Sequence, residues 1–137
     1  MALNVTHHER EGVAILDLHG RITLGEGDLV LRSEIDQVLS TGQNRMVLNL
    51  GKVTHIDTAG LGTLLRARAD LAGAGGGLAL ANLHPVHLTL LVLAKLEFIF
   101  EIFEDEQEAV NSYYPDRKVN TFDVLSFVRQ MKKEDEE

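Results

Sequence analysis

The chain contains no cysteine among its 137 residues. This absence excludes disulfide bonds, metal sites built on thiolates and a cysteine nucleophile. The length fits one domain, since single domains commonly contain about 100–150 residues. With 45% hydrophobic and 25% charged residues, the composition is that of a globular chain and not of a disordered one.

The chain also lacks an apolar run long enough to cross a membrane. The stretch 71–94 carries no Asp, Glu, Lys or Arg, but glycines, Asn82, Pro85 and two histidines interrupt it. A spanning helix would not gather such residues. The N-terminus alternates polar and apolar residues, without the basic start and long apolar core of a signal peptide. We therefore expect no membrane insertion and a cytoplasmic location.

Positive charge is scarce in the sequence. The 13 lysines and arginines against 21 acidic residues give a formal net charge of −8, which would repel nucleic acid and an anionic membrane surface. Arg66 and Arg68 are the only closely spaced basic pair before the C-terminal extension, so no segregated basic patch offsets this charge. The charge predicts a protein partner with a basic or mixed surface and no direct contact with nucleic acid.

Along the chain, the spacing of apolar residues alternates between the period of strands and that of helices. We expect a hairpin of two strands, 3–6 and 12–19, joined through a slightly longer polar loop. Further strands are expected at 45–50, 78–82 and 98–103, and helices at 28–40, 58–71, 85–94 and 105–113. This alternation predicts an α/β domain with a mixed central β-sheet and about four crossover or flanking helices.

A new apolar pattern begins after Pro115. Phe122, Leu125, Phe127 and Val128 recur at helical spacing, and an acidic end that we expect to fray follows them. The sequence therefore predicts a domain at 1–115 and a C-terminal helical extension with an acidic tail at 116–137. The apolar stripe of this extension either covers the domain or makes an oligomer or partner contact, and the oligomeric state stays open.

The histidines and glycines invite readings as a metal site or a nucleotide site. His84 and His87 are spaced i, i+3, and His7 lies beside His8, but no further residues complete a convincing set of metal ligands. The glycines at 75–77 follow a helix and precede a strand, the reverse of the order that nucleotide motifs require. No acid–base pair and no nucleophile motif can be placed from the sequence. We expect no metal, no cofactor and no enzymatic activity.

The most informative segment is 46–62. A strand suited to burial leads into Asp57-Thr58, where a helix begins. Thr58 would lie beside the unpaired amides and the positive dipole end of this helix, where a phosphate is readily held. Asp57 has two compatible roles, because it can cap the helix and orient the acceptor hydroxyl. Gly60 and Gly62 either let a partner approach the backbone closely or serve helix–sheet packing.

Several segments together resemble the STAS domain, and in particular the bacterial anti-sigma-factor antagonists. The resemblance rests on Asp57-Thr58-Ala59-Gly60-Leu61-Gly62 at a helix start and on five further segments, Leu18–Ile22, Val47–Leu50, Val53–Asp57, Leu80–Val86 and Leu90–Phe100. It covers about residues 3–113 and implies a four-helix α/β domain with a mixed sheet. Arg21 departs from the family pattern by standing where many members carry an acid. Lys95 replaces the usual glycine, and we expect a changed turn there.

The resemblance implies a protein switch and not a catalyst. In the family, an unphosphorylated antagonist binds a kinase-type anti-sigma factor, which then releases its sigma factor. The kinase inactivates the antagonist by phosphorylating a Ser or Thr after the motif aspartate, and a phosphatase restores it. The expected partners are therefore a serine/threonine kinase that acts as an anti-sigma factor, and a phosphatase. By position the acceptor is Thr58, and the implied partner-binding residues are Arg21, Thr23, Asp57, Thr58, Ala59, Gly60, Leu61 and Gly62.

Two other functions fit the same resemblance. Free-standing STAS domains also resemble small subunits of lipid-transport ATPase complexes, in which the hydroxyl would contact the ATPase. Others resemble ligand-sensing modules of larger assemblies, for which a bound nucleotide or other small molecule would be the sign. The intact acceptor motif favours the antagonist over both.

Overall fold

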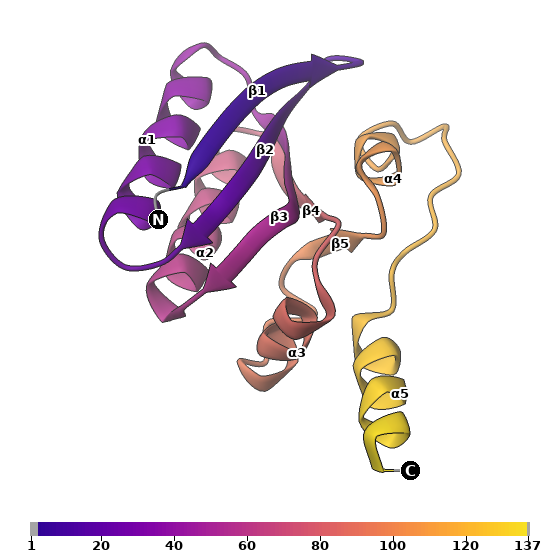
Figure 1. The fold of residues 1–137 in the computed structure, drawn as a ribbon. Helices are drawn as coiled ribbons and strands as arrows, with labels where there is room; N and C mark the ends of the chain where they lie inside the picture. Colours follow the sequence, from indigo (N-terminus) through magenta and orange to yellow (C-terminus); the bar gives the residue numbers. More distant parts are fainter. Residues whose placement is uncertain (1–2, 137) are drawn as a thin grey trace.

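A five-stranded mixed sheet in the order β1-β2-β3-β4-β5 organises this computed structural model, which describes residues 3–136. The strands are β1 (Asn4–Arg10), β2 (Val13–Ile22), β3 (Arg45–Ile56), β4 (Gly77–Ala81) and β5 (Glu101–Phe103); the helices are α1 (Glu26–Ser40), α2 (Thr58–Gly73), α3 (Pro85–Leu93), α4 (Glu106–Asn111) and α5 (Val124–Glu136) (Figure 1). The mixed α/β architecture predicted from the sequence is confirmed. Within residues 3–136, no helix has the length and apolar character needed to cross a membrane.

A two-residue turn joins β1 and β2, which pair antiparallel, whereas all other neighbouring strands are parallel. Glu11 and Gly12 form the turn with positive φ angles of 53° and 84°, a handedness that matches the twist of a hairpin. The longer loop predicted from the sequence is wrong, because β1 continues to Arg10. Arg117 lies 2.6 Å from the Glu11 carboxylate and Tyr114 donates to the Glu11 carbonyl, so the segment after α4 holds this turn.

Strand β3 runs through the predicted strand 45–50 and continues to Ile56. Its pairing with β2 shifts register at two points, and such irregularities let a strand bend. The Asn49 side chain supports the first of them, because its carbonyl oxygen accepts the Gly51 N–H at 3.1 Å. The additional length of β3 delivers the chain directly to Asp57 at the start of α2.

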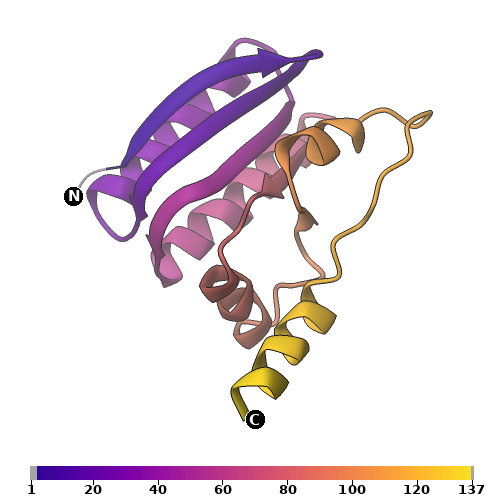
Figure 2. The same ribbon diagram turned by 45° about the vertical axis from the view of Figure 1, so that its right-hand side comes forward.

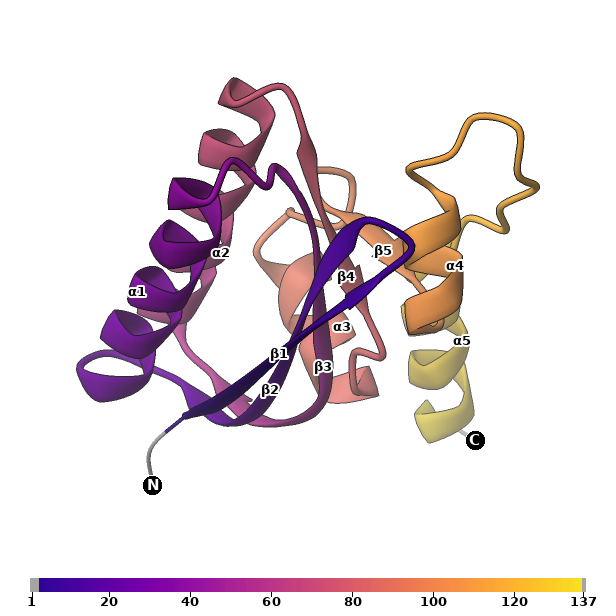
Figure 3. The ribbon, with the colours of Figure 1, turned by 90° about the horizontal axis from the view of Figure 1, so that it is seen from above.

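Both faces of the sheet are covered by helices, because apolar residues occupy both sets of alternating positions in its central strands. The larger core cluster includes Leu16, Leu48 and Leu80 and continues into α1, α2 and α3. The smaller cluster includes Ile15 and Val47 and faces α4. Seen from above, α1 and α2 lie on one side of the sheet and α4 on the other (Figure 3).

The last strand is shorter than the sequence predicts. The segment 98–103 was expected to form it, but β5 begins at Glu101. A turn precedes the strand, in which the Ile99 N–H donates to the Leu96 carbonyl at 3.0 Å, and Phe98 is 79% exposed. The apolar run overstates the strand because its first residues form the connection from α3.

Lys95 adopts a left-handed backbone conformation after α3, with a φ of 60°. The Lys95 N–H donates to the Val92 carbonyl at 3.0 Å, and the Leu96 N–H donates to the Leu91 carbonyl at 2.8 Å. This is the hydrogen-bond pattern of a helix that ends on a left-handed residue, usually glycine. The turn therefore keeps the conformation that glycine favours, although a lysine occupies it.

Helix α5 packs against α3 and extends the larger core cluster. Val124 and Val128 are buried in that cluster, and Phe122 and Met131 pack against it. Phe127, which the sequence placed in the same apolar stripe, is 37% exposed. The helix predicted for the C-terminal extension is confirmed, and part of its stripe covers the domain. The last residue of the predicted acidic tail lies outside the described residues.

Replacing Lys95 by glycine should stabilise the protein. A side chain in the left-handed conformation costs about 1–2 kcal/mol, partly offset by the extra freedom of glycine in the unfolded chain. We expect the free energy of unfolding, measured by urea denaturation, to rise by about 0.5–1 kcal/mol. Lys132→Gly, at an exposed helical position of α5, is the control and should cost up to about 1 kcal/mol. Loss of stability in both variants would contradict this account of Lys95.

Candidate functional site

Asp57 links α2 to the loop between β2 and α1. Its Oδ1 accepts the Gly60 N–H at 2.9 Å, which caps α2, and its Oδ2 accepts the Leu24 N–H at 2.9 Å. The Asp57 N–H donates to the Ile22 carbonyl at 3.4 Å. These backbone donors, Leu24 first and then Gly60, hold the pKa of the Asp57 carboxyl below its ordinary value because they stabilise the charged form. The capping role predicted for Asp57 is confirmed.

Thr58 is the first residue of α2 and is exposed. It stands at the N-terminal end of a 16-residue helix, where amides lack intrahelical partners and the dipole favours negative charge. Figure 2 shows the start of α2 with the loop between β2 and α1 on one side and α3 on the other. The position suits an acceptor hydroxyl, because a second protein can reach it and a phosphate there would not disturb the core.

The two glycines in the first turn of α2 have different environments. A Cβ at Gly60 would stand 2.1 Å from the Ile22 carbonyl oxygen, whereas a Cβ at Gly62 would meet no heavy atom within 4 Å. Gly60 and the next residue, Leu61, are buried, while Gly62 is exposed. Gly60 therefore serves helix–sheet packing, and of the two glycines only Gly62 is open to a partner.

An apolar groove, which we call the Thr58 groove, borders the start of α2 on the side of α3. It has a volume of about 430 Å³ and is lined by the end of β3 with Asp57, by the α3 residues Val86, Leu90 and Leu93, and by Thr23. Val86 is 67% and Leu93 75% exposed. Exposed apolar side chains gathered around a groove are typical of a protein-binding surface.

His87 lies buried at this groove, with an exposed fraction of 4%. Its Nδ1 has no hydrogen-bond partner among the described residues. Burial lowers the pKa of His87, and the nearby His84 and His55 lower it further, because an imidazolium would be desolvated and repelled there. The His84 ring lies 6.2 Å from the His87 ring, edge to face. His87 is therefore neutral at pH 7 and contributes an uncharged wall to the Thr58 groove.

Arg21 and Thr23 flank the site from the end of β2. Arg21 is exposed and pairs in register with His55 of β3. The Thr23 carbonyl accepts the Asp28 N–H at 2.9 Å, which fixes the loop that leads into α1. Arg21 thus places one positive charge at this end of the sheet, in a chain whose net charge is −8.

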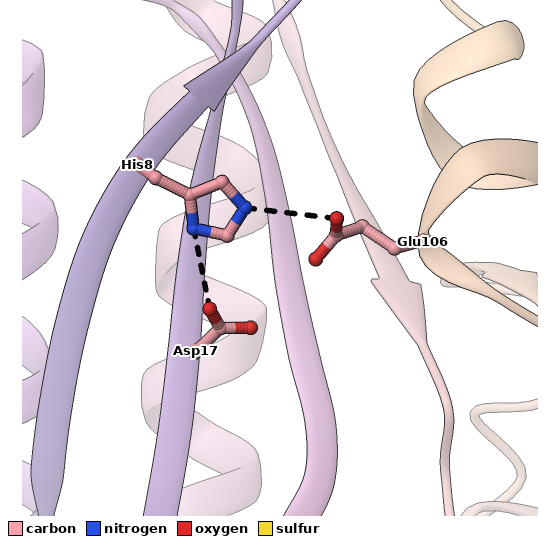
Figure 4. A group of neighbouring side chains, drawn as sticks. All are labelled: His8, Asp17 and Glu106. Carbon is pink, nitrogen blue, oxygen red and sulfur yellow. Dashed lines mark ion pairs between the residues drawn. The ribbon is translucent and has the colours of Figure 1, made fainter.

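A second group of titratable side chains lies on the face of the sheet that α4 covers (Figure 4). His8 Nδ1 lies 3.2 Å from Asp17 Oδ2, and His8 Nε2 lies 3.6 Å from Glu106 Oε2. One ligand atom of each residue lies within 4.8 Å of the others, close enough to share a cation. However, the Arg10 guanidinium is 2.9 Å from the same Glu106 oxygen, and Asn49 donates to the other at 3.3 Å. Because Arg10 and Asn49 engage both Glu106 oxygens, the carboxylate of Glu106 already has partners within this network of side chains.

The structure brings the predicted site residues to one end of the sheet. Thr58 and Gly62 are exposed at the start of α2, and Ala59 is half-buried. Arg21 lies near the end of β2, next to β3 in the sheet. Sequence reasoning missed the Thr58 groove, whose walls come from β3 and α3. The charge-free stretch 71–94 contains α3 and was the available signal. The His8 network was also missed, because its members come from β1, β2 and α4.

The family model of the STAS domain matches residues 4–109. The chain belongs to the STAS domain family. The matched part of this STAS domain includes Thr58, the Thr58 groove and the whole sheet, and it ends within α4. Helix α5 lies after the last matched residue.

Relatives of this STAS domain include a curated protein of Paenibacillus polymyxa named anti-sigma F factor antagonist, which is 28% identical over 111 residues, 80% of this chain and 94% of the relative. A solved anti-sigma factor antagonist from Mycobacterium paratuberculosis has a TM-score of 0.73 at 18% identity, covering 82% of this chain and 94% of that one. The unphosphorylated form of the Bacillus protein SpoIIAA has a TM-score of 0.63 at 15% identity, and the match covers 85% of this chain and 100% of that one. Its phosphorylated form has a TM-score of 0.61 at 17% identity, covering 80% of this chain and 98% of that one. The solved structures establish likeness of fold.

Replacing Gly60 by alanine should destabilise the STAS domain. The new Cβ would stand 2.1 Å from the backbone oxygen of Ile22, and overpacking of this kind costs about 1–3 kcal/mol. Gly62→Ala is the matched control two residues along the same helix. It should be neutral or stabilise by up to about 1 kcal/mol through helix propensity. Urea denaturation of both variants measures the difference, and equal effects would contradict the packing role of Gly60.

His87 should make stability depend on pH. Because its pKa is lowered from 6.5 in the folded state, the unfolded chain binds a proton first as pH falls. The contribution of His87 is therefore intact above pH 6.5 and is lost progressively below it. The free energy of unfolding, measured from pH 7.5 to 5, should fall less steeply in His87→Gln than in the wild type. His19→Gln, at an exposed position of β2, is the control and should keep the wild-type slope.

Proposed function

We propose that this STAS domain is an anti-sigma-factor antagonist, which binds a kinase-type anti-sigma factor when Thr58 is unphosphorylated. Phosphorylation of Thr58 by that kinase ends binding, and a phosphatase restores it. The observation that carries the proposal is the exposed Thr58 at the capped start of α2, beside an apolar groove. In this function the protein is a substrate and a binding module, and it catalyses nothing itself.

The geometry explains how one phosphate would separate folding from binding. The group adds about 1.5–2 negative charges, and the N-terminal end of α2 favours negative charge, so the fold should survive. A partner packed over Thr58 and the Thr58 groove would instead have to desolvate the phosphate. Asp57, ionised beside it, would add repulsion to any carboxylate of the partner. Binding is therefore the step that phosphorylation weakens.

The names of relatives support the proposal. The Paenibacillus relative is named for its action against an anti-sigma factor, and the structure of SpoIIAA is known in a phosphorylated and an unphosphorylated form. In this chain the hydroxyl, the capping aspartate and the open Gly62 come together at one helix start. Gly60 and Leu61, which are buried, would shape the interface from beneath.

The test compares the affinities of wild type and Thr58→Asp for each kinase-type anti-sigma factor encoded in the source genome. We expect Thr58→Asp to weaken binding about 100-fold, since an uncompensated charge at an interface costs several kcal/mol. The melting temperature should stay within about 2 °C of wild type, because the helix start favours the charge. Ser33→Asp, on the exposed face of α1, is the control for added charge and should bind like wild type.

Mass spectrometry after incubation with the kinase and ATP should place one phosphate on the wild type and none on Thr58→Val. Equal affinity of wild type and Thr58→Asp would overturn the proposed switch. A stable complex with a transport ATPase that both variants retain would instead make the protein a structural subunit. A nucleotide or other small molecule that co-purifies with the protein and leaves kinase binding absent would favour a sensory module.

A further inference from the structure

A second groove, which we call the β5 groove, lies between β5 and the start of α5. It separates the edge strand β5 from residues 121–125, which include the start of α5, and its volume is about 510 Å³. Figure 2 shows the chain that leads into α5 running alongside β5. The groove shares no lining residue with the Thr58 groove. The two grooves are therefore separate surfaces of the domain.

The walls of the β5 groove combine apolar and polar side chains. Phe98 and Phe100 line one side, and Phe122 and Leu125 line the other. Phe98 is 79% exposed, an unusual degree for so large an apolar side chain in water. The Phe122 ring packs against the Phe127 ring of α5, with centroids 5.5 Å apart, so an aromatic contact ties this wall to α5.

Three carboxylates border these walls. Glu97 and Glu101 come from the β5 side and Asp123 from the α5 side. Glu97 Oε2 is buried without a hydrogen-bond partner. None of the three makes an ion pair with lysine or arginine within residues 3–136. Both Asp123 oxygens accept hydrogen bonds from Ser126, whereas Glu97, which is half-buried, and Glu101 are available to pair with a cationic group that enters the groove.

The backbone of β5 adds a third element. The strand pairs with β4 on one side and forms the edge of the sheet on the other. An edge strand presents unpaired N–H and C=O groups that can accept an added strand. Only residues 101–103 are in this strand, so the edge matches a short extended segment and not a long one.

We propose that the β5 groove binds a short extended segment of a partner protein in which basic and aliphatic residues alternate. The segment would lie along β5, its basic side chains would reach Glu97 and Glu101, and its aliphatic side chains would contact Phe98 and Phe122. Nucleic acid and anionic membrane do not fit, because the groove and the chain as a whole are acidic. The proposal does not depend on phosphorylation of Thr58.

The test uses a capped, fluorescently labelled heptapeptide of sequence Lys-Val-Lys-Val-Lys-Val-Lys and the full chain. Fluorescence anisotropy should show binding that weakens as salt is raised, and NMR shifts should be confined to residues 96–103 and 121–127. A peptide with glutamate in place of lysine should not bind. Replacing Glu97 and Glu101 by glutamine should weaken binding about tenfold, the effect expected for two partly exposed charge pairs.

Two controls distinguish this site from non-specific attraction and from the proposed switch. Glu9→Gln removes one negative charge from β1 at the other edge of the sheet and should leave peptide affinity unchanged. Thr58→Asp should also bind the peptide like wild type, so failure of the kinase test would not affect this result. Equal weakening by Glu9→Gln, or NMR shifts elsewhere, would overturn the proposal. A dimer in sedimentation that the Glu97 and Glu101 substitutions dissociate would overturn it in favour of a second copy of the chain.

Discussion

The carboxylate of Asp57 joins the two backbone segments that flank the candidate site. One oxygen takes the Gly60 N–H of α2 and the other takes the Leu24 N–H of the loop before α1. Both helices also come unusually close to the end of β2: added Cβ atoms at Gly60 and Gly27 would each stand 2.1 Å from a carbonyl oxygen there. The cap and the close approach together fix the start of α2, and with it Thr58, against the end of β2.

Helix α2 has a buried side that packs in the core and an exposed start that carries Thr58. The buried side of α2 belongs to the larger core cluster, whereas Thr58, Gly62 and the rim of the Thr58 groove face solvent. A charge added at Thr58 therefore acts on the surface and leaves the core unchanged. The low pKa of Asp57 has the same origin as its structural role, because the donors that favour its charged form are those that hold the loop and the helix.

The chain after α4 contacts both edges of the sheet. The segment after α4 crosses back to the β1–β2 turn through Arg117 and Tyr114, and α5 then returns to pack on α3. The extension therefore connects the two edges of the sheet. It also builds one wall of the β5 groove, which a STAS domain that ended at α4 would lack. The residues beyond the family match thus add a surface to the domain as well as covering its core.

From the sequence alone, apolar periodicity and the Asp57-Thr58 motif predicted the α/β class, most of the elements, the cap of α2 and the position of Thr58 at the start of that helix. These features are local, because a cap or a helical stripe depends on residues within a few positions of one another. The two-residue turn at Glu11 and the late start of β5 were not predicted, since contacts from Arg117 and the connection from α3 decide them. The role of Gly60 as against Gly62, the two grooves and the His8 network arose only in the tertiary structure. Each depends on atoms from segments far apart in the chain, whose distances sequence spacing does not determine.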